Sequence, residues 1–176
     1  MTTHIALLRG INVGGRTNIA MADLRQVFAG LGCEEVRTYL RSGNVVFGCA
    51  DSAVAGLAAA VEQRVARDLG VSTTVLLRTA GELARVVAGN PFLDEESDLT
   101  RLHVGFLSEP PGPQARLSVP GQGRERFRLA GRELFLHYPD GVGRSRFTNA
   151  HIEKQLGVAA TARNWRTVLA LAEMTR

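Results

Sequence analysis

The chain has 176 residues, a formal net charge of +4 at pH 7 and a pI near 9.8. Hydrophobic residues make up 45% of it and charged residues 22%, which is typical of a globular protein with a core of its own. The longest apolar run is far too short to span a bilayer, so the sequence does not indicate a membrane protein. The first ten residues have neither the basic stretch nor the cleavage site of a signal peptide, so we expect a cytoplasmic location.

The first half of the chain predicts strands and helices in the order β-α-β-β-α-β. Short apolar runs indicate the strands, and apolar stripes at spacings of three and four residues indicate the helices. The expected strands cover residues 4–9, 34–43, 44–48 and 72–79, and the expected helices cover 21–32 and 51–70, the second capped by Asp51 or Ser52.

This order is that of the ferredoxin-like split βαβ unit (βαββαβ), a four-stranded antiparallel sheet with both helices on one face. The sequence therefore predicts an α+β fold. We expect a ferredoxin-like subdomain over residues 1–90 and a second α+β subdomain over residues 91–176, packed as one compact unit.

The second half predicts an incomplete copy of the first, in the order βαββα with C-terminal helices. Thr79 and Glu82 form a capping box for a helix through Ala88, and the acidic residues 94–98 indicate a surface loop. The other expected elements are a strand at 102–107, a hairpin at 126–139, a helix from Thr148 or Asn149 to Leu156, and a last helix from Thr161 with Trp165, Val168, Leu169 and Ala172 on its buried stripe.

Residue types that bind metals or react are present but scattered. Cys33 and Cys49 lack CxxC spacing and histidine partners, so we expect reduced, half-buried thiols without a redox or metal role. The four histidines lie far apart in the sequence, and neither G-x-S-x-G nor H-E-x-x-H occurs. The sequence predicts no metal and no cofactor, and it leaves open whether the protein is an enzyme.

A glycine-rich loop follows the first strand, in the sequence LLRGINVGGRT from Leu7 to Thr17. Residues 10–17 fit the spacing of a Walker A phosphate loop, but Arg16 stands where that loop needs lysine. Three further residues separate the loop from the expected helix, whereas a Walker loop leads directly into its helix. A simple chain turn is therefore the better interpretation.

The predicted topology places this loop beside the turn between the second and third strands. Both turns lie at the same end of the sheet, together with the N-terminus of the first helix. Cations, amides and a helix N-terminus predict a site for a small anion bearing phosphate or carboxylate. The candidate residues are Arg9, Gly10, Asn12, Gly14, Gly15, Arg41, Ser42 and Asn44, with Arg163 and Asn164 as possible support. The alternative is that the asparagines bind only turn backbone.

Five motifs in order resemble the domain-of-unknown-function 1697 family of bacterial proteins: ALLRGINVGG, TYLRSGNVVF, NPF, IEKQLG and TARNWRTV. The resemblance spans nearly the whole chain. It implies a compact α+β protein with ferredoxin-like features, and it supplies no activity.

Two other functions remain open beside anion binding. The stretch from Ala115 to Arg146 holds seven arginines against Glu125, Glu133 and Asp140, which could contact nucleic acid or simply face solvent. The expected first strand lacks the exposed aromatics of an RNA-binding sheet. A structural or partner-binding protein without catalysis is the third possibility, and the oligomeric state is not predicted.

Overall fold

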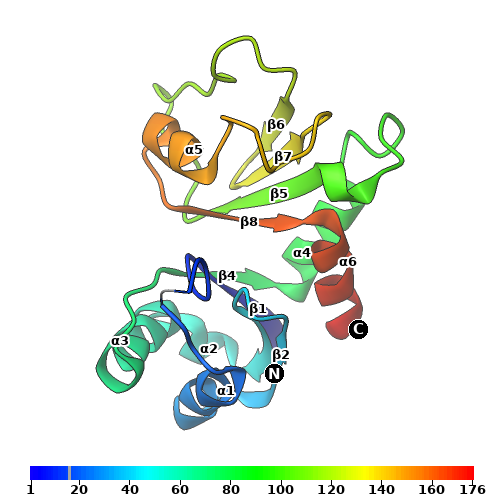
Figure 1. The fold of residues 1–176 in the computed structure, drawn as a ribbon. Coiled ribbons are helices and arrows are strands. Elements are labelled where there is room, and N and C mark those ends of the chain that lie inside the picture. The colour runs from blue at the N-terminus through cyan, green and yellow to red at the C-terminus, as the bar shows by residue number, and fades with distance from the viewer. Residues whose placement is uncertain (16) are drawn as a thin grey trace. The chain divides into compact units, whose positions relative to one another are not determined.

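The computed structural model describes residues 1–15 and 17–176 and shows an α+β protein with two four-stranded antiparallel sheets (Figure 1). The chain forms two compact units. Unit 1 consists of residues 1–84 and 171–176, and unit 2 of residues 85–170. Within the described residues, every helix is too short or too polar to cross a membrane.

Unit 1 contains the predicted first sheet, with strand order β2-β3-β1-β4. Its elements are β1 (Thr2–Leu8), α1 (Met21–Gly30), β2 (Glu34–Tyr39), β3 (Asn44–Cys49), α2 (Asp51–Val54), α3 (Leu57–Leu69) and β4 (Val75–Thr79). Helix α4 (Ala80–Ala88) follows β4 and begins with the predicted capping box. The Thr79 N–H donates to Glu82 Oε2 at 2.8 Å, and the Glu82 N–H donates to Thr79 Oγ1 at 3.1 Å.

The core of unit 1 lies between its sheet and helices α1 and α3, which cover one face of the sheet in Figure 1. Alternate residues of β1, such as Ala6 and Leu8, face this core because successive strand side chains point to opposite faces. Phe28 of α1 packs against Phe47 of β3 with ring centroids 5.1 Å apart. Apolar periodicity in the sequence therefore located this layer correctly.

The long helix expected over residues 51–70 is divided, which corrects the sequence prediction. Helix α2 ends at Val54 and α3 begins at Leu57, after Gly56 with φ 80°. A left-handed residue cannot continue the hydrogen bonding of a right-handed helix. The apolar stripe runs through both pieces, so periodicity alone could not show the break.

Unit 2 contains a second sheet with strand order β6-β7-β5-β8. Its elements are the 3₁₀ helix η1 (Leu99–Arg101), β5 (Leu102–Leu107), β6 (Arg126–Ala130), β7 (Glu133–His137), α5 (Asn149–Leu156) and β8 (Ala160–Asn164), followed by α6 (Trp165–Met174). Helix α5 packs on one face of this sheet through Ile152 and Leu156 (Figure 1).

The last helix begins later than predicted, because residues from Thr161 to Asn164 belong to strand β8. The Asn164 side chain then accepts a hydrogen bond from the Thr167 N–H at 2.9 Å and caps α6. Leu169, expected on the buried stripe, is 36% exposed, and the fully buried leucine of α6 is Leu171. The helical stripe thus begins at Trp165 and runs through Val168 and Leu171.

The two sheets have the same strand order. The second half therefore contains a fourth strand, β8, that the sequence prediction lacks, but residues 108–125 between β5 and β6 form no helix equivalent to α1. Ile5 pairs with Arg78 across β1 and β4, and Val104 pairs with Arg163 across β5 and β8. The Leu8 N–H donates to the Gly43 carbonyl at 2.9 Å, and the Leu107 N–H to the Arg132 carbonyl at 2.8 Å. Residues 99 positions apart therefore occupy equivalent places in β1 and β5.

Candidate anion site at a loop edge

The glycine loop and the β2–β3 turn lie side by side in unit 1. Asn12 Nδ2 donates to the Arg41 carbonyl at 2.6 Å, which joins the two loops directly. A third segment adjoins them, because the Arg9 N–H donates to the Thr74 carbonyl at 2.9 Å and Thr73 Oγ1 donates to the Arg9 carbonyl at 2.8 Å. The topology predicted from sequence places the two turns at the same end of the sheet, but it does not predict this particular hydrogen bond.

Asn12 is positioned entirely by backbone groups. Its φ of 55° is in the left-handed region, which asparagine tolerates better than most residues. Its Nδ2 donates to the Ile19 carbonyl at 3.1 Å as well as to Arg41, and its Oδ1 accepts from the Ile19 N–H at 2.8 Å. Its own N–H donates to the Thr17 carbonyl at 3.1 Å.

Asn44 has a similar role at the start of β3. It is fully buried, and its Nδ2 donates to the Tyr39 carbonyl at 2.8 Å and to Ser42 Oγ at 3.0 Å. Both asparagines therefore hold the loops in place. The contacts shown for these two side chains are with the protein, and a direct role for either in binding a ligand stays a prediction.

Gly43 lets the two loops approach closely. A Cβ atom here would lie 2.8 Å from Ile11 Cδ1 and 2.9 Å from Leu8 Cβ, and φ is 87°. Ile11 and Leu8 are buried, so neither can move aside easily. Only glycine fits both the space and the backbone conformation at this turn.

The outer surface of the glycine loop is open. Gly10, Gly14 and Gly15 have φ values of 71°, 63° and 72°, and no atom of residues 1–15 and 17–176 lies within 4 Å of a Cβ placed on any of them. Left-handed turn residues can direct successive N–H groups into one concave surface, where they attract anions. Arg41 is exposed and Arg9 is half-buried, while Arg16 lies outside the described residues.

The N-terminus of α1 follows the glycine loop after a short connection. Its N-cap residue, Ala20, makes no side-chain capping hydrogen bond, so no N-cap side chain occupies the first-turn amides. The positive end of the helix dipole favours an anion nearby, although Asp23 in the first turn reduces this effect.

Comparison with known proteins shows to which protein family the chain belongs. The family described as "Protein of unknown function (DUF1697)" matches residues 1–135. The chain belongs to this family. Its fold is similar to that in "The structure of conserved bacterial protein SP0830 from Streptococcus pneumoniae", with 25% sequence identity, 99% of each chain covered and a TM-score of 0.70. No curated protein matches the chain.

Arg163 and Asn164, which the sequence predicts as possible support for the anion site, belong to unit 2 and have partners there. Arg163 donates to Thr161 Oγ1 at 2.7 Å and to the Ala162 carbonyl at 2.9 Å, and burial lowers its pKa to about 10. Asn164 caps α6. The interactions shown are thus structural, and a supporting role toward a ligand stays a prediction.

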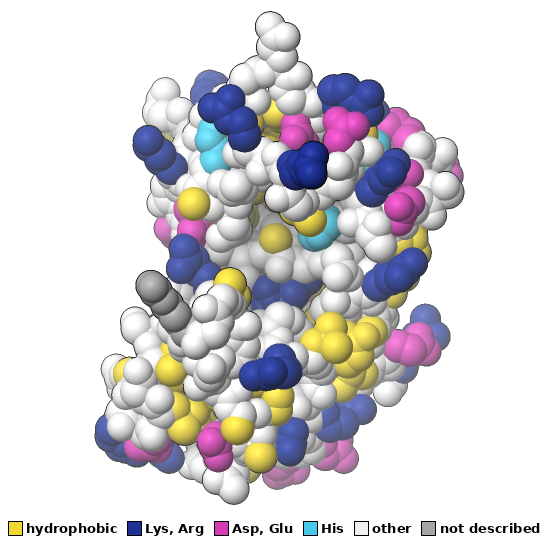
Figure 2. Space-filling view, viewed as in Figure 1, with side chains coloured by type: hydrophobic (Ala, Val, Ile, Leu, Met, Phe, Trp, Pro, Cys, Tyr) yellow, Lys and Arg dark blue, Asp and Glu magenta, His cyan; other side chains and the backbone are white. Residues whose placement is uncertain are grey.

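The basic region from 115 to 146 is partly neutralised within unit 2. Arg124 pairs with Asp140 at 3.2 Å, and Arg126 pairs with Glu95 and lies 5.2 Å from the Phe92 ring centre. On the face seen in Figure 2, basic and acidic side chains are intermixed. The nucleic-acid interpretation stays a prediction, with the exposed Arg128, Arg144 and Arg146 as its best candidates.

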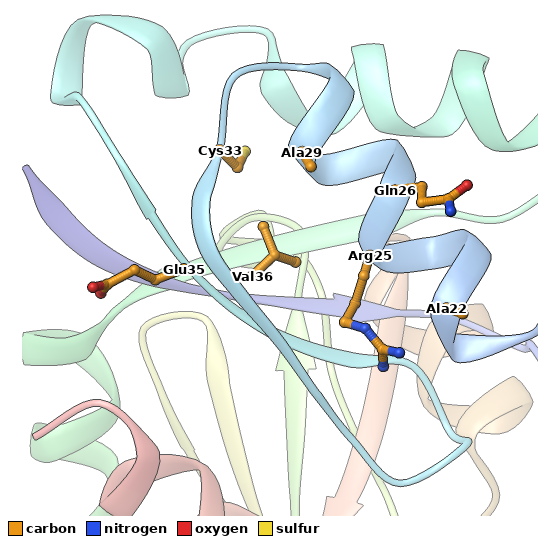
Figure 3. Close-up of a pocket in the computed structure, with 7 residues that line it drawn as sticks. All are labelled: Ala22, Arg25, Gln26, Ala29, Cys33, Glu35 and Val36. Atoms are coloured by element: carbon orange, nitrogen blue, oxygen red, sulfur yellow. The ribbon is translucent and has the colours of Figure 1, made fainter.

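Two features of unit 1 were missed at the sequence level. A groove of about 430 Å³ lies between α1 and β2, lined by Ala22, Arg25, Gln26, Ala29, Cys33, Glu35 and Val36 (Figure 3). The second feature is that Cys33 and Cys49, which looked unrelated in sequence, lie next to each other and are both buried. Neither feature has a local sequence signal, because the groove depends on how α1 lies beside β2 and the cysteine pair depends on the register between β2 and β3.

Proposed function

We propose that the loop edge of unit 1 binds a small molecule bearing a phosphate or carboxylate group. One observation carries this proposal: the 2.6 Å hydrogen bond from Asn12 Nδ2 to the Arg41 carbonyl holds two arginine-bearing turns together. The asparagine thereby fixes the backbone of both loops before any ligand arrives. Such preorganisation reduces the loss of conformational entropy that accompanies binding.

The chemistry of the edge matches an anion in two ways. The exposed Arg41 guanidinium can donate two parallel hydrogen bonds to a phosphate or carboxylate. The left-handed glycines leave open space in which an anion could approach the backbone closely. The proposal concerns binding and assigns no reaction.

Two exposed apolar side chains narrow the class of ligand. Val13, next to Asn12, is 66% exposed, and Leu40, next to Arg41, is 54% exposed. Leu40 also has a φ of 58°, a strained conformation for leucine of the kind often found at functional sites. We therefore expect an anion with an apolar part, such as an aryl phosphate or a nucleoside monophosphate, to bind better than inorganic phosphate.

The test measures the melting temperature and the Kd with inorganic phosphate, phenyl phosphate, AMP and benzoate. A ligand that binds the folded state raises the melting temperature by mass action. Arg41→Gln should weaken binding of phenyl phosphate by roughly 10- to 100-fold, since a hydrogen bond to a charged group contributes about 1.5–3 kcal/mol.

Arg85→Gln is the matched control, because Arg85 is also an exposed arginine and lies on α4, within unit 2. It should bind phenyl phosphate as the unaltered chain does. The proposal fails if no compound of the panel shifts the melting temperature, or if the two variants lose affinity equally.

A further inference from the structure

Cys33 and Cys49 face each other across the β2–β3 pair. Glu34, the first residue of β2, pairs with Gly48 in this antiparallel ladder. Cys33 comes directly before Glu34 and Cys49 directly after Gly48, so the same register sets the two cysteines opposite each other. Both are free thiols, 6% and 4% exposed, in the same core cluster. The two thiols are close enough for Cys49 to contribute to the raised pKa of Cys33.

A β-bulge creates this juxtaposition. Near the turn, Arg37 pairs with Val46, a register that would place Cys33 opposite Ala50. The bulge between Glu34 and Arg37 shifts the register by one residue, with Glu35 at φ 50°. Opposed Cβ atoms in antiparallel strands lie about 4.5–5.5 Å apart, and a disulfide needs about 3.5–4.5 Å. A shift of about 1 Å therefore suffices for bonding.

The groove between α1 and β2 gives small reagents a route to this pair. Cys33 lines it together with Ala29 and Val36, and Figure 3 shows Cys33 in the connection between α1 and β2. Alanines at positions 22 and 29 leave this part of the α1 surface shallow. A molecule the size of hydrogen peroxide fits easily in a groove of about 430 Å³.

We propose that Cys33 and Cys49 form a reversible intramolecular disulfide when the protein meets hydrogen peroxide. The Cys33 thiolate attacks one peroxide oxygen, the O–O bond breaks, and the departing hydroxide takes a proton to leave as water. The sulfenic acid formed on Cys33 is then attacked by the Cys49 sulfur, its S–O bond breaks, and a second water leaves. Two thiols and one peroxide thus give one disulfide and two waters.

The environment makes this reaction slow at neutral pH. Burial raises the pKa of the Cys33 thiol to about 11, and the neighbouring Cys49 contributes in the same direction. The reactive form is the thiolate, so the rate should rise about tenfold with each unit of increase in pH below that pKa. The pair would therefore respond to sustained oxidation rather than to brief exposure.

The disulfide would tie the edge strand β2 to β3 beside the bulge. A crosslink that closes a loop of this length typically stabilises a protein by restricting its unfolded state, with a rise in melting temperature of roughly 5–10 °C. It would also fix the wall of the groove that Cys33 and Val36 form.

The test treats the whole chain with hydrogen peroxide at pH 7, 8 and 9, alkylates remaining thiols in denaturant, and maps the peptides by mass spectrometry. We expect a peptide pair joined through Cys33 and Cys49, formed faster at higher pH and removed by dithiothreitol. The melting temperature should rise on oxidation, and Cys49→Ser should abolish this rise.

Two results would overturn the proposal. One is that both cysteines remain fully alkylatable after peroxide treatment at pH 9. The other is that all disulfides formed join separate chains, as seen on a non-reducing gel. The peptide map of the unaltered chain decides the matter even if a cysteine variant folds poorly.

Discussion

At the scale of single residues, the close approach of the two loops depends on Gly43. Gly43→Ala should destabilise the protein for two reasons: an unfavourable φ of 87° and a collision with Ile11 and Leu8. The first typically costs about 1 kcal/mol, and overpacking a core adds about 1–3 kcal/mol. Urea denaturation measures the total loss in the free energy of unfolding, which is the sum of these two costs.

Gly32→Ala separates the two causes. Gly32 has a φ of 85°, and a Cβ atom added to it would meet nothing within 4 Å, so only the backbone cost of about 1 kcal/mol applies. Equal losses in the two variants would show that Ile11 and Leu8 relax around the added methyl group. The loop edge would then be less rigid than its hydrogen bonds indicate.

The sequence predicted the adjacency of the two loops but not the roles of their side chains. The hydrophobic pattern predicts the order of strands and helices along the chain. The split βαβ topology that matches this order then places the two turns at one end of the sheet. The partners of Asn12, by contrast, are carbonyls of Ile19 and Arg41, seven and 29 residues away. Such contacts depend on exact loop conformation, which residue type alone does not determine.

At the scale of elements, the acidic segment over residues 94–98 is more than a solvated loop. Glu96 Oε1 lies 3.1 Å from His137 Nε2 on β7 and 3.7 Å from Arg101, and Asp98 Oδ2 lies 3.5 Å from Arg101 Nε. Glu95 pairs with Arg126 on β6. These contacts attach the segment to the end of the second sheet where Arg126 begins β6 and His137 ends β7.

These contacts of Glu96 predict that the stability of the protein depends on pH. The hydrogen bond to His137 is the largest cause that lowers the pKa of Glu96, followed in the same direction by the Asp98 N–H and Arg101. A carboxyl group whose pKa is lower in the folded than in the unfolded state stabilises the protein at pH values above the ordinary glutamate pKa. This contribution is lost as the pH falls through the lowered pKa. Glu96→Gln should therefore reduce the melting temperature at pH 7 but have little effect at pH 3.

Asp94→Asn provides the control for this experiment. Asp94 is exposed and, within residues 1–15 and 17–176, has no ion pair, so its replacement should leave the melting curve nearly unchanged at both pH values. A loss for Glu96→Gln that is as large at pH 3 as at pH 7 would assign the effect to packing rather than to charge.

Element boundaries show where sequence patterns stop being informative. The Thr79–Glu82 capping box is a local signal, and the helix begins where it predicts. The β2–β3 bulge and strand β8 depend on pairing with other strands. For that reason, residues 161–164 could be assigned to the final helix from sequence, and the opposition of Cys33 and Cys49 could not be foreseen.

At the scale of the whole molecule, the two sheets repeat one topology with different side chains. Arg78 and Arg163 are buried arginines at equivalent positions, and each is followed by a residue that caps the next helix, Thr79 or Asn164. The two sheets are equivalent in strand register and in backbone hydrogen bonds. Many residue types can form the same backbone hydrogen bonds, so the residues at equivalent positions differ. A common architecture therefore exists without a visible sequence repeat.

The repeated topology predicts the same order of local stability in both units. The interior strands β3 and β1 in unit 1, and β7 and β5 in unit 2, hydrogen-bond to a neighbour on each side. Strand β2 is an edge strand with a bulge, and β6 is an edge strand whose side chains are mostly exposed. Local opening begins where backbone hydrogen bonds are exposed and apolar contacts are few.

Hydrogen–deuterium exchange with peptide-level mass spectrometry measures this order under native conditions. Amides of β2 and β6 should exchange at least tenfold faster than those of β1 and β5, since a difference of about 1.4 kcal/mol in opening free energy is tenfold in rate. If β6 exchanged as slowly as β5 while β2 exchanged quickly, the two units would differ in what limits their opening. The shared strand order would then not determine the local stability of the strands. The difference in exchange rate would instead come from the side chains in which the two sheets differ.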